Sequence, residues 1–345
     1  MQTPAQRPTD LPEPYRSPLD DPAFRRAPEP LPHGETDDTG DPVAWLSINL
    51  KSGGTDVTPG DTLLRRHGSL NMDRLQRFHE IIGLAPTHPH VIFFQEAKWF
   101  DTYGSELLHY IERQLRGTGY GDYRGFLTRS PRSHHHQVVF IDTDRLQAVH
   151  HWRRDDRDEP QGLYGYVEVI VDEDERRPIW LKSIHLDPRD GDSRLADARQ
   201  LHAVVKPGQR AIVAGDWNSI TARRTELQGE PQRHFAAMPA AQRYGKGIWP
   251  PTLSGNDTGP ETRALDYLLD VGWVCQAIQD DHTTPTIAPG YDRGGELIID
   301  RCLTYGGLRT VPNSVWVDQS DLDYSDHRAL GGALTIVDDP AEDAS

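Results

Sequence analysis

Charged side chains follow apolar runs at several points of the sequence, where a strand would end and a cleft would begin. Glu96, His185 and Asp216 each stand within two residues of the end of such a run. Sheets present the groups at strand ends to clefts, while the middles of their strands are packed. Each residue alone is ordinary, since a single acid or histidine in a loop is usually a solvated or structural group. Their repetition at successive strand ends indicates a shared site.

Five further polar residues stand within or beside predicted strands. Asn49 and Asp300 lie inside apolar runs, Asn218 follows one, and Asp326 and His327 precede the last one. Carboxylate and amide oxygens are hard ligands that suit Mg²⁺, Mn²⁺ or Ca²⁺ better than zinc, which would need cysteine or paired histidine ligands. Mg²⁺ usually binds one or two carboxylates, keeps several waters and contacts substrate phosphate. A divalent metal with acids and histidines beside it can catalyse the hydrolysis of a phosphate ester.

Strands and helices that could position these residues alternate between residues 43 and 337. Apolar runs predict strands at 43–50, 90–95, 137–141, 164–171, 179–184, 210–214, 297–303, 310–317 and 330–337. Apolar residues at helical spacing, with capping and stop residues, predict helices at 71–84, 105–116, 193–205 and 261–271. Because this order has no strict strand–helix–strand repeat, it predicts sheets packed face to face with helices outside, around one core.

Both ends of the chain differ from this central part. Residues 1–42 hold 10 of the 27 prolines and have no hydrophobic period. Such a segment buries too little apolar surface to offset its ordering entropy, so a disordered tail is expected, with a proline-rich docking arm as the alternative. Residues 338–345 are predicted to be an acidic disordered tail. The region 43–337 is expected to be a single catalytic domain.

Composition excludes several classes of protein. The sequence lacks the stretch of about 18 apolar residues that a membrane-spanning helix needs. Its N-terminus does not resemble a signal peptide, so a cytoplasmic protein without membrane contact is expected. Cys275 and Cys302 cannot form a disulfide framework or a cysteine zinc site, and we expect two buried thiols. The net charge of −16 argues against a polyanionic partner. About half of that charge lies in the two tails, which weakens the argument.

The ordered set of motifs resembles a known superfamily. Its pieces are Asn49, Gln95-Glu96, His185, Asp216-Trp217-Asn218, Asp300 and Ser325-Asp326-His327. In this order they resemble the endonuclease/exonuclease/phosphatase superfamily, the deoxyribonuclease I-like phosphoesterases, over about residues 43–337. The resemblance implies an α/β fold, a four-layered sandwich of two packed, mostly antiparallel sheets flanked by helices. It also implies hydrolysis of a phosphate ester with Mg²⁺ or Mn²⁺ as cofactor.

The resemblance also implies roles for single residues. The expected metal ligands are Asn49, Glu96 and Asp326, and the expected catalytic residues are His185, Asp216, Asn218, Asp300 and His327. Asp216 and Asn218 would activate the attacking water, while His327, oriented by Asp300, and His185 would stabilise the phosphate. Lys98 stands where several branches of the superfamily place a basic residue near the phosphate, and is expected to bind substrate.

Three features stay open at this stage. The strand at 137–141 usually lends a polar residue to the cleft, and His136 or Gln137 could serve. The triple-histidine run 134–136 could be a soft-metal patch or a plain polar loop. Trp217 could stack on a base or sugar, although packing inside the protein is the default interpretation of such a large ring.

The motifs indicate the reaction rather than the substrate. A nuclease-like phosphodiesterase is the leading hypothesis, because arginine pairs such as Arg65-Arg66 and Arg223-Arg224 lie in the long loops and could contact nucleic acid. The same pairs could be ordinary surface ion pairs. The alternatives are a phosphomonoesterase acting on a small phosphorylated metabolite and a non-catalytic binding module of the same fold. The expected partner is a phosphate-ester substrate, with nucleic acid as one option, and no protein partner can be inferred.

Overall fold

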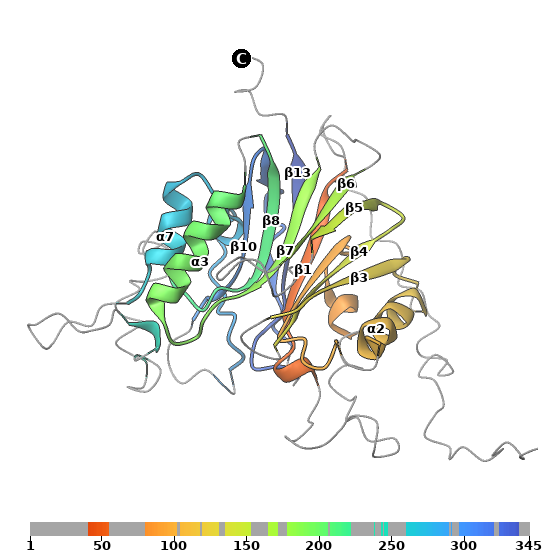
Figure 1. Ribbon diagram of the computed structural model, residues 1–345, viewed down its shortest axis with the longest axis horizontal. Coiled ribbons are helices and arrows are strands. Elements are labelled where there is room, and N and C mark those ends of the chain that lie inside the picture. Colours follow the sequence, from red (N-terminus) through yellow and green to blue (C-terminus); the bar gives the residue numbers. More distant parts are fainter. Residues whose placement is uncertain are drawn as a thin grey trace, which may run out of the picture.

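Two β-sheets pack face to face in the computed structural model, with helices on both outer faces (Figure 1). The structure describes residues 41–54, 80–101, 104–117, 119–130, 135–152, 165–171, 178–205, 208–221, 238, 243, 245–247, 260–289, 291, 297–320 and 324–337. The layers run helix, sheet, sheet, helix, and the strands of each sheet are mostly antiparallel. The four-layered α/β sandwich expected from the sequence is therefore confirmed.

The first sheet has the strand order β11-β13-β1-β2-β4-β3, with the short β12 paired to β13. Its strands are β1 (Val43–Asn49), β2 (Val91–Gln95), β3 (Tyr123–Thr128), β4 (Gln137–Asp142), β11 (Leu308–Thr310), β12 (Trp316–Val317) and β13 (Leu330–Ile336). Strands β1 and β2 are parallel, and the other pairs are antiparallel.

The second sheet has the strand order β5-β6-β7-β8-β10-β9. Its strands are β5 (Leu146–Trp152), β6 (Tyr166–Val171), β7 (Ile179–His185), β8 (Arg210–Asp216), β9 (Val274–Cys275) and β10 (Asp300–Tyr305). Here β7 and β8 are the parallel pair. Each sheet thus carries one parallel pair near its centre, and the two pairs contact each other across the sandwich.

Helices cover the outer faces of both sheets (Figure 1). Helix α2 (Glu106–Gly117) packs against the first sheet near β3. Helices α3 (Gly191–Val204) and α7 (Arg263–Asp270) pack against each other on the second sheet. Two further elements are short, the helix α8 (Gln276–Gln279) and the 3₁₀ turn η4 (Ser52–Gly54). Asp190 caps α3, because its side chain accepts a hydrogen bond from the backbone N–H of Asp192 at 3.0 Å.

Alternate residues of the central strands enter two different apolar cores. Trp45 and Phe93 point into the core between the sheets, and their neighbours Leu46 and Phe94 join the core beneath α2. Successive side chains of a strand point to opposite faces, so a strand covered on both faces needs apolar residues at nearly every position. The continuous apolar runs in the sequence have this cause.

Several predicted boundaries were wrong. Strands β3 and β5 were not predicted, because they are edge strands of their sheets and carry exposed polar residues that hide the apolar pattern. The strand predicted at 310–317 is two short strands, β11 and β12, separated by a turn in which Asn313 has a φ of 58°. The strand predicted from residue 297 begins at Asp300, and the helix predicted from residue 261 begins at Arg263.

Other predictions fall partly or wholly outside the described residues. Of the helix predicted at 71–84, the structure describes residues 80–84, which are helical. The predicted tails lie outside the described residues except for Asp41 and Pro42, whose carbonyl groups accept hydrogen bonds from Arg145. Cys275 and Cys302 are free and buried, as expected. Among the described helices, none is long and apolar enough to cross a membrane.

Candidate active site

The parallel pairs of the two sheets end at a common edge of the sandwich. In the first sheet Asn49 lies beside Gln95, the residue before Glu96, and in the second sheet His185 lies beside Asp216. Contacts across the sandwich join the two ends, since Asn49 Nδ2 lies 3.4 Å from Asp216 Oδ2. Neighbouring parallel strands end on the same side, so this topology brings residues from distant parts of the sequence together.

A buried layer of hydrogen bonds lies directly beneath this edge. Gln95 Nε2 donates to Ser183 Oγ at 2.9 Å, and Ser183 Oγ donates to the carbonyl oxygen of Phe94 at 2.7 Å. These side chains are buried, and buried polar groups with satisfied hydrogen bonds favour a single arrangement of their elements. The layer therefore fixes the position of β7 against β2, and with it the geometry of the site above.

Asp216 is the centre of the site. It is 2% exposed, its Oδ1 accepts the backbone N–H of Asn218 at 2.8 Å, and its Oδ2 accepts Asn218 Nδ2 at 3.0 Å. Asn49 Nδ2 approaches the same oxygen. Asn218 has a φ of 48°, a left-handed conformation that asparagine tolerates better than most residues. Two amides thus hold this carboxylate in one orientation.

His327 lies between two carboxylates. Its Nδ1 is 2.8 Å from Asp300 Oδ2, and its Nε2 is 3.8 Å from Asp216 Oδ2. Burial alone would lower the pKa of His327, but the charges of Asp300 and Asp216 and the hydrogen bond to Asp300 outweigh it and raise that pKa to about 10. The imidazole is therefore protonated at neutral pH and can donate from Nε2 to an anionic ligand.

Glu96 is held in a turn after β2. Its φ is 53°, and its Oε2 accepts the backbone N–H of Ser52 at 2.8 Å. His185 Nε2 lies 3.9 Å from Glu96 Oε1 and 3.5 Å from Asp216 Oδ2, so one imidazole spans the two carboxylates. The Glu96 side chain is 18% exposed, which leaves it accessible to an ion and its waters.

The described residues offer two groups of possible metal ligands. One is Glu96 with His135 and His185, and the other is Asp216 with Asp300 and His327; in each group the ligand atoms lie within 4.8 Å of one another. A partly exposed carboxylate surrounded by room for water fits a divalent ion, which usually takes one or two carboxylates in such enzymes. Glu96 meets this requirement.

The other two expected metal ligands are Asn49 and Asp326, and Asp326 belongs to neither of these groups of acids and histidines. Asn49 uses both ends of its amide, because Oδ1 accepts the backbone N–H of Lys51 at 3.0 Å and Nδ2 faces Asp216. The Asp326 carboxylate accepts a hydrogen bond from the hydroxyl of Ser325 at 3.3 Å. The structure therefore joins Asn49 to Asp216, and it brings Asp326 to the site's edge through its neighbour His327.

The remaining sequence candidates lie as follows. The Lys98 ammonium lies 5.1 Å from the centre of the Trp99 ring, while its backbone N–H donates to the carbonyl oxygen of Glu96. Trp217 is fully buried and its indole N–H donates to the carbonyl oxygen of Arg301 at 3.1 Å, so its ring packs inside the protein and does not stack on a ligand. His136 is buried and its Nε2 faces Asp101 at 3.2 Å.

Sequence reasoning missed two residues of the site. His135, from the triple-histidine run, lies with Nδ1 3.5 Å from Glu96 Oε2. Lys246 donates to the carbonyl oxygen of Asn218 at 3.1 Å and also to Asn218 Oδ1. Burial lowers the pKa of Lys246 to about 8, although the charge of Asp216 opposes this shift. The histidine run was a visible signal for His135, whereas nothing in the long loop around Lys246 distinguished it.

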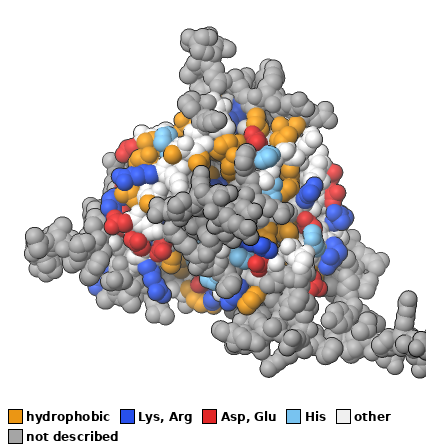
Figure 2. Space-filling view, in the orientation of Figure 1, with side chains coloured by type: hydrophobic (Ala, Val, Ile, Leu, Met, Phe, Trp, Pro, Cys, Tyr) orange, Lys and Arg blue, Asp and Glu red, His pale blue; other side chains and the backbone are white. Residues whose placement is uncertain are grey.

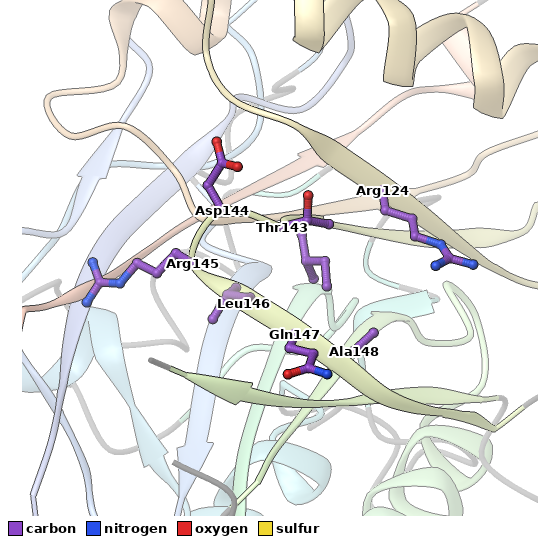
Figure 3. Close-up of a pocket in the computed structure, with 8 residues that line it drawn as sticks. Arg124, Thr143, Asp144, Arg145, Leu146, Gln147 and Ala148 are labelled. Carbon is purple, nitrogen blue, oxygen red and sulfur yellow. The ribbon is translucent and has the colours of Figure 1, made fainter. Parts of the chain in front are cut away.

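A separate hollow lies at the opposite end of β4. It has a volume of about 660 Å³ and is lined by residues of β3, β4 and the start of β5. Figure 3 shows the side chains of Arg124, Asp144 and Arg145 pointing away from one another. Arg145 is in addition bound to the backbone before β1. Because binding sites need convergent polar groups, this hollow is not the candidate active site.

Residues 46–327 match the model of the Endonuclease/Exonuclease/phosphatase family, and the chain belongs to this family. No curated protein matches the sequence. Truncated TDP2 from Caenorhabditis elegans is a similar solved structure, with 13% identity, coverage of 87% of this chain and 99% of that chain, and a TM-score of 0.51. The endonuclease/exonuclease/phosphatase from Bacteroides vulgatus has 12% identity, coverage of 86% and 99%, and a TM-score of 0.52.

These structural likenesses show the fold. Family membership supports a phosphoesterase or nuclease enzyme, and enzymes of this family typically use divalent metals. The acids and histidines at the edge of the sandwich are groups that could bind such an ion.

Proposed function

We propose that the protein is a phosphodiesterase of the nuclease type that depends on Mg²⁺ or Mn²⁺. One observation carries the proposal: Asp300, His327 and Asp216 form a line of close contacts, 2.8 Å and 3.8 Å long, beside the partly exposed carboxylate of Glu96. Hydrolysis of a phosphate ester requires a group that accepts a proton from water, a proton donor and a metal ligand. Candidates for all three lie at one edge of the fold.

In this proposal Asp216 accepts a proton from the attacking water. Hydrogen bonds from the amides of Asn49 and Asn218 restrict the rotation of its carboxylate. Asn218 also orients the water, and its own Nδ2 is anchored to the carbonyl oxygen of Leu186 at 3.1 Å. A held base avoids the reorganisation that a free carboxylate would need.

His327 supplies positive charge to the phosphate oxygens. Its protonated imidazole donates from Nε2, while Asp300 on the opposite side fixes the ring orientation. His185, with Nε2 3.5 Å from Asp216 Oδ2, lies beside the same carboxylate. It would contact a phosphate bound there. These pre-positioned hydrogen-bond donors would stabilise the negative charge that develops on the phosphate oxygens in the transition state.

Glu96 would hold the metal ion, with Asn49 and Asp326 as the further ligands that the family resemblance suggests. When bound, the ion neutralises charge on the phosphate and its leaving group. Lys98 is proposed to bind substrate, which requires its side chain to leave the Trp99 ring.

The charge of the site favours a diester over a monoester. Three carboxylates, Glu96, Asp216 and Asp300, gather at this edge, and the described basic groups among them are His135, His185, His327 and Lys246. A phosphodiester carries one negative charge and a monoester nearly two at neutral pH, so the diester meets less repulsion. On the face seen in Figure 2, described Lys and Arg side chains are interspersed with acidic ones, so charge alone does not select a long polyanion.

The test compares substrates and ions on the full chain. After treatment with a chelator, hydrolysis of bis(p-nitrophenyl) phosphate, p-nitrophenyl phosphate, plasmid DNA and RNA is measured with and without Mg²⁺ or Mn²⁺. We expect metal-dependent cleavage of the diester and of at least one nucleic acid. Turnover of the monoester alone would reject the nuclease proposal, and no turnover at all would support the non-catalytic alternative.

A further inference from the structure

Two imidazoles approach the Glu96 carboxylate, one at each of its oxygens. His135 Nδ1 lies 3.5 Å from Glu96 Oε2, and His185 Nε2 lies 3.9 Å from Glu96 Oε1. The two rings are nearly parallel, with 7° between their planes and 6.2 Å between their centres. Each imidazole therefore presents one nitrogen to a different oxygen of the same carboxylate.

These separations suit direct coordination of one ion. A tetrahedral zinc ion about 2.0–2.1 Å from each ligand separates neighbouring ligand atoms by roughly 3.3–3.4 Å. The contact from His135 to Glu96 Oε2 is close to that value, the contact from His185 to Glu96 Oε1 is about half an ångström longer, and the ligand atoms of all three side chains lie within 4.8 Å of one another, so the side chains must draw together around the ion. The three side chains are 34%, 12% and 18% exposed for His135, His185 and Glu96, so an ion can enter and keep a water ligand.

The chemistry of this set differs from a magnesium site. Mg²⁺ prefers oxygen ligands in octahedral geometry, whereas imidazole nitrogen suits zinc and other late first-row ions. The sequence favoured oxygen ligands because few of the candidate ligands were cysteines or paired histidines. Folding brings His135 and His185, which are 50 positions apart, to the two oxygens of one carboxylate.

We propose that Glu96, His135 and His185 form a binding site for a divalent transition-metal ion of the zinc type, which binds there more tightly than Mg²⁺. The inference rests on the proposed function only in that Glu96 and His185 belong to both. The second group of possible ligands, Asp216, Asp300 and His327, does not contain His135, so variants of His135 distinguish the two groups. An ion of the zinc type would displace Mg²⁺ from Glu96.

Binding is measured directly, without reference to catalysis. The full chain, freed of metal by a chelator, is titrated with Zn²⁺ and with Mg²⁺ in a calorimeter, and Co²⁺ is added to record its visible absorption. We expect Zn²⁺ to bind at least about 100-fold more tightly than Mg²⁺, and Co²⁺ to give the intense bands of a site with four or five ligands.

His135→Ala and His135→Gln test the new ligand. Each should weaken Zn²⁺ binding by at least about 10-fold, since even outer partners of metal ligands are worth 10–100-fold, and should weaken the Co²⁺ bands. The control is His109→Ala. His109 Nδ1 lies 2.8 Å from Glu112 Oε2 on α2, a His–Glu pair that belongs to neither group of described ligands. This variant should bind Zn²⁺ as the wild type does.

The outcomes separate this inference from the proposed function. Zn²⁺ affinity within 2-fold of wild type in a folded His135 variant would overturn the inference, and so would equal affinity of the wild type for Zn²⁺ and Mg²⁺. Selective Zn²⁺ binding by a protein that hydrolyses none of the substrates would uphold the site and reject the proposed function. Hydrolysis with Mg²⁺ and no selectivity for Zn²⁺ would do the reverse.

Discussion

Asp300 and Asp216 are direct partners in the antiparallel register of β10 and β8, and His327 contacts both carboxylates. Two acids this close would repel each other if nothing lay between them. The protonated imidazole of His327 removes that repulsion, and the acids in turn hold its proton. Asp216, Asp300 and His327 therefore act as a unit, and changes to any of them should affect the others.

Replacing the proposed base should abolish most of the activity. We expect Asp216→Ala to lower kcat for diester hydrolysis by on the order of 10²-fold or more, and His327→Ala to do the same. Asp192→Ala, a change at the exposed start of α3, is the control and should keep wild-type rates. Near-normal kcat in either site variant would mean that the catalytic residues have been misassigned.

Asp300 should control the pH dependence of the rate. His327 donates while protonated, so activity should fall as pH rises through its pKa of about 10. Asp300→Asn keeps a hydrogen-bond acceptor but removes the negative charge that raises this pKa, so the alkaline limb of the kcat profile should move to lower pH. If the alkaline limb of the Asp300→Asn profile stays at the same pH, even with a lower kcat, Asp300 does not act through His327.

Lys246 should act by positioning Asn218. Lys246→Met removes the donor to Asn218 Oδ1 and should lower kcat by about 5- to 10-fold with little change in KM. In an Asn218→Ala background the same change should have a much smaller effect, because the side-chain acceptor is gone and only the hydrogen bond to the backbone carbonyl of residue 218 is left to lose. Additive losses in the double variant would contradict this role and would suggest that Lys246 contacts the substrate itself.

Gly215 should be irreplaceable before Asp216. Its φ is 149°, and a Cβ atom would lie 2.0 Å from the carbonyl oxygen of Ile184. We expect Gly215→Ala to force β8 away from β7, reducing the unfolding free energy by more than about 2 kcal/mol. Gly104→Ala is the control, since Gly104 also has a positive φ but open space around it, and should cost only about 1 kcal/mol. Denaturant unfolding of both variants would settle the difference.

His90 should make the fold sensitive to acid. Burial and the nearby charge of Arg145 lower the pKa of His90 to about 4. Below pH 6.5 the unfolded chain binds a proton at this residue and the folded protein does not, so stability should fall between pH 6.5 and 4, by up to about 3 kcal/mol. His90→Asn, which can still accept the backbone N–H of Ala44, should flatten this decline in denaturant unfolding. An equally steep decline in the variant would exclude His90 as its source.

Much of the fold could be predicted because buried strands consist of runs of apolar residues, which are visible in the local sequence. The central strands are covered on both faces, and their runs of apolar residues were visible in the sequence. Buried Trp217 agreed with the packing interpretation. The edge strands β3 and β5 lack such runs, since polar residues such as Arg124, Gln147 and His150 interrupt them.

The sequence by itself determined which residues end the central strands, and therefore which chemical groups reach a cleft. Only the tertiary structure decided their partners. The parallel register of β7 with β8 and the antiparallel register of β10 with β8 bring His185, Asp216 and Asp300 side by side. Register depends on packing between residues far apart in the chain, as does the approach of His135 to Glu96, so no local pattern could encode either.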